Sequence, residues 1–365
     1  MRSNRKKLNY VALIFLVCML ASSFYLPIAQ SSDLVVDIPT ELEDINVLTL
    51  VASNVGDNFL DVRDTLEGWN CTVTTIGRSP SVLTHGGTVV SVDLQAEDFD
   101  FDEDLPNYDL FFVPSGAWWQ SIANNFIYTD FIREVYEHDS QILVGSMCIG
   151  SAILGSAKIV EGKKILVHGL GAFYIMDEGG IFITGLNVLS DERILTGATG
   201  SGVNGHENAP YQEFSQTVVK EVLGLSYLDN YTIEEVDNVI LGTHKITVNT
   251  QTQYELDNLL TGVERNISEV EVVFYPSNDR KDIIELSLDE VAENTYEGYI
   301  DEEVDGKYTV KVEIYNNIDE CEIVTIDYGM RINSIPGFSI LIISLTGVFA
   351  IGILLLITGK KIHRR

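Results

Sequence analysis

The stretch Ile142–Ala157, ILVGSMCIGSAILGSA, places a cysteine where a buried strand gives way to a row of small residues. Residues Gln141–Val144 predict the strand, and Cys148 follows where the chain must change direction. From Gly150 on, the apolar residues recur with helical spacing, at Ile153, Leu154 and Ala157. A strand, a sharp turn and a helix with a nucleophile at the apex form a nucleophile elbow. The alternative is a buried cysteine that serves as a small hydrophobic residue at a strand end.

The residues around this stretch alternate short apolar runs with helical patterns. The runs predict strands at Val47–Ala52, Cys71–Gly77, Tyr108–Gly116 and Gln141–Ser146, and helices at Phe59–Trp69 and Asn125–His138. Continuously apolar strands separated by helices are typical of a parallel sheet that is covered on both faces. We therefore predict an α/β domain over residues 45–225.

The pattern changes near Leu225–Tyr231. Residues 231–332 are rich in Val, Ile, Thr and Tyr at alternate positions, as in EVEVVFYPSND at Glu269–Asp279. Several short strands with turn signals between them predict an all-β sandwich of immunoglobulin or fibronectin type. This second domain shows no catalytic cluster, so we interpret it as a stalk or a binding module.

Both ends of the chain carry membrane signals. Residues 1–31 combine a basic start, an apolar run at Tyr10–Leu20 and small residues, which predicts a signal peptide or an uncleaved signal anchor. Residues 335–358 are apolar throughout and predict a transmembrane helix, and the basic tail 359–365 predicts a cytoplasmic end. The stretch IPGFSILIISLTG also resembles the carboxy-terminal sorting tails of archaeal surface proteins. We therefore expect a cell-surface protein that is anchored in the plasma membrane with its ectodomain outside.

The expected ectodomain is strongly acidic. It contains all 54 Asp and Glu residues but 15 of the 23 Lys and Arg residues, since four precede it and four follow it, and its formal charge is −39. Such a surface repels nucleic acid, which is therefore excluded as a partner. The scattered histidines and the lack of a Cys-x-x-Cys pair predict no metal site, and no phosphate-binding loop or other cofactor site is predicted.

Four motifs, in this order, resemble the ThiJ/PfpI family of the class I glutamine amidotransferase-like superfamily. They are YDLFFVPSG at 108–116, GSMCIGSAILGSAKIVEGKKI at 145–165, VHG at 167–169 and DERILTGATGSG at 191–202. The resemblance implies a flavodoxin-like fold for residues 45–225. It also implies a cysteine-dependent hydrolase or lyase, meaning a peptidase, an amidase or a glyoxalase-like enzyme, that acts on a small-molecule or peptide substrate.

The resemblance assigns roles to named residues. Cys148 would be the nucleophile, with its pKa lowered by the start of the helix. The backbone amides of Gly116 and Ile149 would form an oxyanion hole. His168 would carry the proton, and the alternative for this residue is a solvent-facing histidine at a strand end.

The sequence also departs from the family pattern. Ile149 stands where many members have a histidine, and Ser115 replaces the first glycine of the Pro-Gly-Gly turn. The family's acid after the first strand is usually Glu, and Asp57 is the nearest match here; the alternative role for Asp57 is to cap the following helix. The remaining candidates for the pocket are a pair of tryptophans and a second candidate base, namely Trp118, Trp119 and His206.

These departures leave other functions open. One is a binding or redox-sensing pseudoenzyme in which Cys148 is oxidised rather than turning over a substrate. Another is an adhesion protein whose sandwich carries the function. Self-association into a homo-oligomer is a further expectation.

Overall fold

The computed structural model describes residues 42, 44–117, 119–198, 210–238, 242–276, 283–300 and 308–326. These residues belong to one compact unit that spans Pro39–Arg365. The predicted signal segment 1–31, the apolar segment 335–358 and the basic tail 359–365 lie outside the described ranges. Within those ranges, no helix is both long and apolar enough to cross a membrane.

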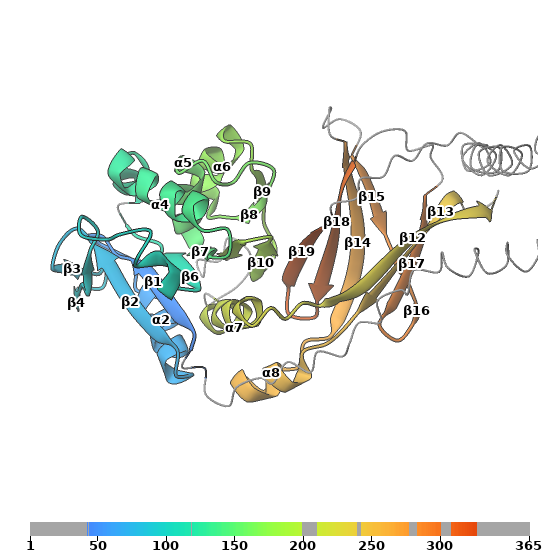
Figure 1. Ribbon diagram of the computed structural model, residues 1–365, viewed down its shortest axis with the longest axis horizontal. Helices are drawn as coiled ribbons and strands as arrows, with labels where there is room; N and C mark the ends of the chain where they lie inside the picture. Colours follow the sequence, from blue (N-terminus) through green and yellow to red (C-terminus); the bar gives the residue numbers. More distant parts are fainter. Residues whose placement is uncertain are drawn as a thin grey trace, which may run out of the picture. The chain divides into compact units, whose positions relative to one another are not determined.

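A parallel sheet forms the centre of the first part of the chain (Figure 1). Its strands are β1 (Asn46–Leu50), β2 (Thr72–Gly77), β5 (Leu94–Gln95), β6 (Leu110–Val113), β7 (Leu143–Met147) and β11 (Ile194–Gly197). They lie in the order β5-β2-β1-β6-β7-β11, and each neighbouring pair is parallel. This is the flavodoxin-like order predicted from the family resemblance, with its topological switch point between β1 and β6.

Helices cover both faces of this sheet, as predicted. Successive residues of a strand face opposite sides, so β6 shows both layers. The ring of Phe111 lies 5.9 Å from that of Phe131, and the ring of Phe112 lies 5.4 Å from that of Phe214. The first layer contains α4 (Phe126–His138) together with α3 (Trp119–Ala123), α5 (Ser151–Ser156) and α6 (Ala172–Asp177). The second layer contains α2 (Asn58–Gly68) and α7 (Tyr211–Val222).

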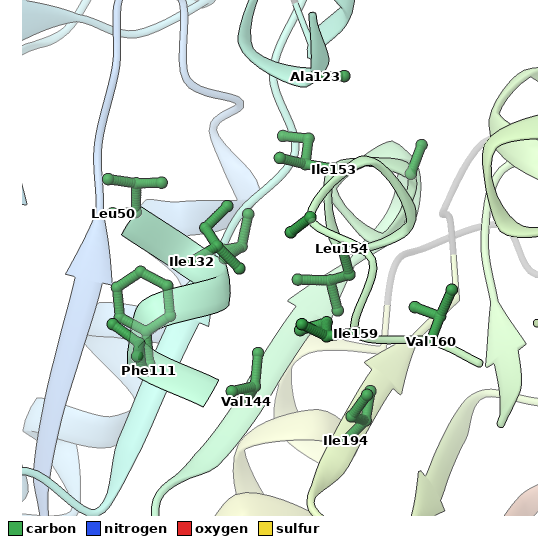
Figure 2. Close-up of a cluster of buried hydrophobic side chains, with 14 of the residues drawn as sticks. Leu50, Phe111, Ala123, Ile132, Val144, Ile153, Leu154, Ile159, Val160 and Ile194 are labelled. Atoms are coloured by element: carbon green, nitrogen blue, oxygen red, sulfur yellow. The ribbon is translucent and has the colours of Figure 1, made fainter. Parts of the chain in front are cut away.

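The larger apolar core lies between the sheet and the first helix layer. Figure 2 shows Phe111 and Val144 of the strands beside Ile132 of α4 and the α5 residues Ile153 and Leu154. All of these side chains are buried. The apolar residues of the strands and of α5 therefore pack in one core. This packing fixes the position of the turn between β7 and α5 relative to the sheet.

The second part of the chain is rich in strands. Its elements are β12 (Leu228–Asn238), β13 (Gly242–Thr250), α8 (Tyr254–Leu260), β14 (Ile267–Pro276), β15 (Ile284–Ser287), β16 (Asp289–Ala292), β17 (Thr295–Ile300), β18 (Tyr308–Asn316) and β19 (Glu320–Ile326). One antiparallel sheet has the order β15-β14-β18-β19, and the other has the order β12-β13-β17-β16. Residues from both sheets, among them Val248 and Val272, share one apolar core.

The sheet does not end where the sequence predicts a domain boundary. Strand β10 (Val188–Asp191) forms a hairpin with β11 and pairs in parallel with β19 on its other side. The parallel sheet and the strands β15-β14-β18-β19 are therefore one sheet of eleven strands (Figure 1). The sequence gives no sign of this continuity, because the pairing joins segments more than a hundred residues apart.

Buried charges hold this junction together. Asp191 is fully buried, and both of its carboxylate oxygens accept hydrogen bonds from Lys311 Nζ at 2.8 and 2.9 Å. Lys164 pairs with the fully buried Glu313, and Lys220 pairs with Glu322. A buried charge is costly without a partner, so each of these groups depends on the other part of the chain.

The shorter elements complete the first part. Strands β3 (Ser81–Leu83) and β4 (Val89–Ser91) form an antiparallel hairpin, and β8 (Lys164–Leu166) pairs in parallel with β9 (Ile181–Ile183). Short 3-10 helices lie at Leu105–Asn107, Cys148–Gly150 and Gly169–Gly171. In sheets of this kind, ligands bind beyond the carboxyl ends of the strands at the switch point, and β1, β6 and β7 end there together.

Candidate functional site

Cys148 sits at a sharp turn between β7 and α5. Its φ angle is +56°, a left-handed backbone conformation that a residue with a side chain seldom adopts. The turn is a single 3-10 unit at Cys148–Gly150, and the buried Ser146 and Ser151 hydroxyls hydrogen-bond across it at 2.8 Å. The structure thus has the strand, turn and helix that the sequence predicts, and Cys148 holds the strained position at the apex.

Gly150 explains why the elbow needs a glycine two residues after the cysteine. A Cβ atom at this position would lie 2.7 Å from the carbonyl oxygen of Val113 and 2.8 Å from that of Pro114. Both atoms belong to the backbone and cannot swing away. The elbow is therefore pressed against the end of β6, which brings Cys148 next to the loop that follows that strand.

The loop after β6 presents a backbone amide to this space. Val55 and Gly116 form an isolated antiparallel bridge, in which Gly56 N–H donates to Ser115 O at 2.7 Å and Ala117 N–H donates to Asn54 O at 3.0 Å. In such a pair the bonds are made by the neighbours, so the Gly116 N–H points away from Val55. Because β1 flanks β6 on one side and β7 flanks it on the other, this N–H faces the side of Cys148. This direction supports the predicted oxyanion role of Gly116.

His168 is fixed by two backbone contacts. Its N–H donates to the carbonyl oxygen of Cys148 at 3.4 Å, and its ring Nδ1 accepts a hydrogen bond from Leu170 N–H at 3.2 Å. With Nδ1 occupied as an acceptor, the neutral ring carries its proton on Nε2. This contact fixes the orientation of the His168 ring at the pocket wall.

Asp57 makes a side-chain contact that the sequence does not predict. It stands at the N-cap position of α2, but its side chain makes no capping hydrogen bond. Its Oδ1 accepts a hydrogen bond from Gly86 N–H at 3.2 Å, in the turn of the β3–β4 hairpin. The carboxylate therefore connects the loop after β1 to this hairpin.

These groups line one pocket of about 480 Å³. Its walls come from five segments, which contribute Gly56 and Asp57; His85; Ser115, Gly116, Ala117 and Trp119; Cys148 and Ile149; and His168 and Leu170. Seven of the nine residues predicted for the site thus meet at one place. The other two, Trp118 and His206, lie outside the described residues.

Ser115 and Trp119 have clear positions in the pocket wall. The Ser115 hydroxyl donates to Asn58 Oδ1 at 2.9 Å, so it connects the loop after β6 to the start of α2. The Trp119 ring is mostly buried and packs edge-on against Tyr174 at 5.0 Å. Trp119 therefore belongs to the core and also lines the pocket.

Two larger hollows lie elsewhere in the described part of the molecule. One of about 620 Å³ is lined by Glu221, Glu322 and other residues of the junction, and one of about 600 Å³ lies between α2 and the start of α7. No cysteine lines either of them. The chemistry of the lining groups, rather than the volume, therefore selects the pocket that contains Cys148.

The three cysteines of the described ranges differ in their surroundings. Burial raises the pKa of Cys71 to about 11, and the charge of Asp109 adds to this effect. Burial also raises the pKa of Cys321 well above its ordinary value, and the charge of Glu313 acts in the same direction. Cys148 is half-buried and faces the pocket. It is the accessible thiol of the three.

Two residues near the pocket are missed by sequence reasoning. His85 lies in the turn of SVLTHGGTVVS, where two short Val-containing runs flank a Gly-Gly pair, and this hairpin signal could have identified it. Tyr211 begins α7, and its pKa is raised by burial, then by the charge of Asp61 and a hydrogen bond with it, and by the charges of Cys148 and Asp57. Nothing in its sequence context indicates this position.

Metal ligation has no support in the described ranges. They contain no group of three or more His, Cys, Asp or Glu side chains placed to hold a metal ion. The described side chains that line the pocket include a thiol, two imidazoles, one carboxylate and one hydroxyl.

Comparison with known proteins finds a family for the part of the chain that forms the pocket. The model of the DJ-1/PfpI family matches residues 41–204. No curated protein matches the chain. Similar solved structures include a two-domain protein with DJ-1/ThiJ/PfpI-like and ferritin-like domains from Anabaena variabilis, at 17% identity and a TM-score of 0.42, over 50% of this chain and 48% of that one. The chain thus spans about half the length of that protein.

Two further structures match the same part of the chain. A ThiJ/PfpI family protein from Pseudomonas syringae is 19% identical, with a TM-score of 0.41, over 51% of this chain and 72% of that one. DJ-1 from Schizosaccharomyces pombe is 14% identical, with a TM-score of 0.42, over 49% of this chain and 92% of that one.

Proposed function

Since residues 41–204 form a domain of the DJ-1/PfpI family, we propose that the protein is a cysteine-dependent hydrolase or lyase, with Cys148 as its nucleophile. The observation that carries this proposal is the position of Cys148, which is held at φ +56° with its side chain lining a pocket. Its substrate would be a small molecule or a peptide with a reactive carbonyl group, as in a peptidase, an amidase or a glyoxalase-like enzyme.

The pocket supports attack on a carbonyl carbon. The Cys148 thiolate forms an S–C bond, and the π electron pair of the carbonyl moves to its oxygen. The amides of Gly116 and Ile149 stabilise that oxygen, since preorganised N–H groups are most effective where negative charge develops. His168 also lines the pocket, and its Nε2–H would supply a further donor.

A second function, redox sensing, is favoured by a specific observation. Cys148 is the half-buried cysteine of the described ranges and lines the pocket, whereas Cys71 and Cys321 are buried. An accessible thiol in a pocket suits oxidation by peroxide to sulfenic acid. In that case Cys148 would report oxidants and the domain would not turn over a substrate.

The two functions are separated by an acylation experiment on the full chain. A cysteine hydrolase treated with p-nitrophenyl acetate should release a burst of p-nitrophenolate that reaches one equivalent per chain and then continue at a steady rate. Cys148→Ser should abolish the burst. A sensor should instead consume one equivalent of hydrogen peroxide at Cys148 and show no steady-state release above that of Cys148→Ser.

The placement of the protein is a separate proposal. The predicted signal segment and the apolar segment 335–358 support display at the cell surface, with anchoring in the plasma membrane. Protease added to intact cells should then remove the acidic region and leave the tail. Survival of that region in intact cells, together with its loss in lysed cells, would contradict this orientation. The immunoglobulin type of the strand-rich region and a homo-oligomeric state stay predictions.

A further inference from the structure

The β3–β4 hairpin is fixed against the loop after β1, so its turn is part of the pocket wall. Asn54 N–H donates to Leu83 O at 2.8 Å, and His85 N–H donates to Val55 O at 2.8 Å. The apolar side of the hairpin contributes Val82 and Val90 to a buried cluster with Val51, Val55 and Phe59. This turn therefore has a defined position in the wall of the pocket that Cys148 also lines.

His85 differs from His168 in the state of its ring. Both line the pocket, together with Cys148 and Asp57. Nδ1 of His168 is occupied by Leu170 N–H, whereas neither ring nitrogen of His85 has a hydrogen-bond or ion-pair partner among the described residues. His85 is also exposed, so its ring can exchange protons with water. Of the two imidazoles, His85 is the one that can serve as acid and as base.

Asp57 holds the backbone next to this imidazole. Its Oδ1 accepts from Gly86 N–H at 3.2 Å, and a Cβ at Gly86 would lie 2.6 Å from Asp57 Oδ2 and 2.8 Å from Oδ1. Only glycine lets the carboxylate approach the turn this closely. The contact is made to the backbone, so the carboxylate fixes the position of Gly86, the residue that follows His85 in the turn.

From these contacts we infer that His85 is the proton carrier of the Cys148 pocket and that Asp57 is a positioning residue for its hairpin. The inference rests on the proposed function and assigns a separate role to each group of the pocket. His168 and the backbone amides stabilise negative charge, and His85 moves the proton. Asp57 and His168 thereby receive roles other than that of the base, and the base comes from a hairpin that carries no predicted site residue.

The proton balance of an amide hydrolysis follows from this assignment. When the S–C bond has formed and the C–N bond breaks, the imidazolium of His85 gives its proton to the departing nitrogen. Water then attacks the thioester carbonyl and gives a proton to the neutral His85. The S–C bond breaks with its electron pair on sulfur, which restores the Cys148 thiolate and the His85 imidazolium.

An activated ester separates these two steps in the full chain. The p-nitrophenolate of p-nitrophenyl acetate leaves without a proton, so acylation of Cys148 does not need His85. Deacylation does need a base, because water must lose a proton. His85→Ala should therefore keep the burst within about 2-fold of wild type and lower the steady-state rate by about 100-fold, the lower end of the effect of general acid–base catalysis.

Imidazole in the buffer tests whether a lost proton carrier explains the defect. It should raise the steady-state rate of His85→Ala several-fold and leave wild type unchanged. His138→Ala is the matched control, since His138 lies on α4 outside the pocket and pairs with Asp102 at 3.2 Å. This variant should behave like wild type with and without imidazole.

Asp57 is tested by two variants that differ in their ability to accept the Gly86 N–H. Asp57→Ala should slow deacylation by about 10-fold with an unchanged burst, since it removes the acceptor and frees the turn. Asp57→Asn keeps an oxygen acceptor and should recover most of the rate. If Asp57→Asn is as slow as Asp57→Ala, the carboxylate charge itself acts in the reaction and the positioning role is overturned.

The outcomes separate this inference from the proposed function. An unchanged steady-state rate in His85→Ala, with a burst that still requires Cys148, overturns the role of His85 and leaves the nucleophile in place. A lost burst in His85→Ala also overturns it, because His85 would then act on the thiol. If wild type shows no Cys148-dependent burst, the proposed function fails, and the role of His85 fails with it.

Discussion

The carboxyl edge of the parallel sheet and its lateral edge at β10 are built in opposite ways. At the carboxyl edge, the Cys148 pocket contains an exposed imidazole, His85, whose ring has no partner among the described residues. At the lateral edge, Asp191 is fully buried and accepts from Lys311 Nζ and from Lys164 N–H. The site keeps a hydrogen-bonding group free, whereas at the junction both carboxylate oxygens of Asp191 accept hydrogen bonds.

This difference indicates which edge carries function and which carries stability. Groups with unused donors or acceptors in a pocket can bind and react, and paired buried charges cannot do so without unfolding. Substitutions in the pocket should therefore change chemistry with little change in the free energy of unfolding. Substitutions at the junction should do the reverse.

Cys148→Ser gives the largest expected effect. It should lower Cys148-dependent turnover by at least about 1,000-fold, since the nucleophile is lost, and leave the urea midpoint nearly unchanged. In wild type at pH 7, iodoacetamide followed by peptide mass spectrometry should modify Cys148 before Cys71 and Cys321. Equal labelling of the three cysteines in the native chain would contradict the accessible-thiol assignment.

Lys311→Met breaks the junction without touching the pocket. It leaves the carboxylate of Asp191 buried without its cation, which should lower the free energy of unfolding by about 3–5 kcal/mol. Both parts of the chain should unfold in one urea transition, because they share a sheet. Tryptophan fluorescence reports on the first part, because Trp69, Trp118 and Trp119 all precede Leu225, and it should show the same shifted midpoint as circular dichroism.

The matched control for Lys311→Met lies in the same strand-rich region. Lys245 pairs with Glu297 at 2.5 Å near the surface, so Lys245→Met should leave the midpoint almost unmoved. Equal effects of the two lysine variants would show that the junction charges carry no special weight.

A chain truncated at Leu225 should aggregate, since it loses β19 together with Lys311, Glu313 and Glu322, which pair with Asp191, Lys164 and Lys220. Its independent folding would confirm the boundary predicted from the sequence.

Gly150→Ala tests whether the turn that holds Cys148 is closely packed against the end of β6. Its Cβ would overlap the backbone oxygens of Val113 and Pro114, which should cost about 1–3 kcal/mol of stability and move Cys148. Gly169→Ala is the control, because a Cβ there meets no atom within 4 Å. If both variants keep wild-type stability and burst kinetics, the elbow is looser than its contacts indicate.

Local signals predicted much of the fold and the pocket. The apolar runs gave β1, β2, β6 and β7, and the helical spacing after Gly150 gave α5. Asp57, Gly116, Cys148 and His168 follow strands or turns that the sequence marks clearly, and a parallel sheet brings such positions to one edge. Local patterns are sufficient there because each residue is placed by its own strand.

The remainder depends on contacts that no local pattern encodes. The pairing of β10 with β19 joins Val188 to Glu320, and neither segment differs from an ordinary strand in its sequence. His85 reaches the pocket through the hairpin that packs on Phe59, so its role depends on the tertiary position of that hairpin. Asp57 makes no capping hydrogen bond, and its side chain accepts instead from the Gly86 amide, which is distant in sequence.

The smallest expected effect is a loss of folding stability at alkaline pH, and it arises at the edge of the sheet opposite to the Cys148 pocket. Cys71 precedes β2 at the amino edge, opposite the edge where Cys148 lies, and burial raises its pKa from 9.0 to about 11. The unfolded chain therefore loses the thiol proton first as the pH rises. The contribution of Cys71 to stability is complete below about pH 9, declines as the pH approaches 11, and is lost above that value. Because the side chain keeps some contact with solvent, this loss should stay below about 2 kcal/mol.

Between pH 8 and pH 10.5, the urea midpoint should fall less in Cys71→Ala than in wild type. The titration of tyrosines and lysines is common to both proteins and cancels in the difference between them. Parallel decline of the two proteins would show that the Cys71 thiol titrates normally in the folded chain.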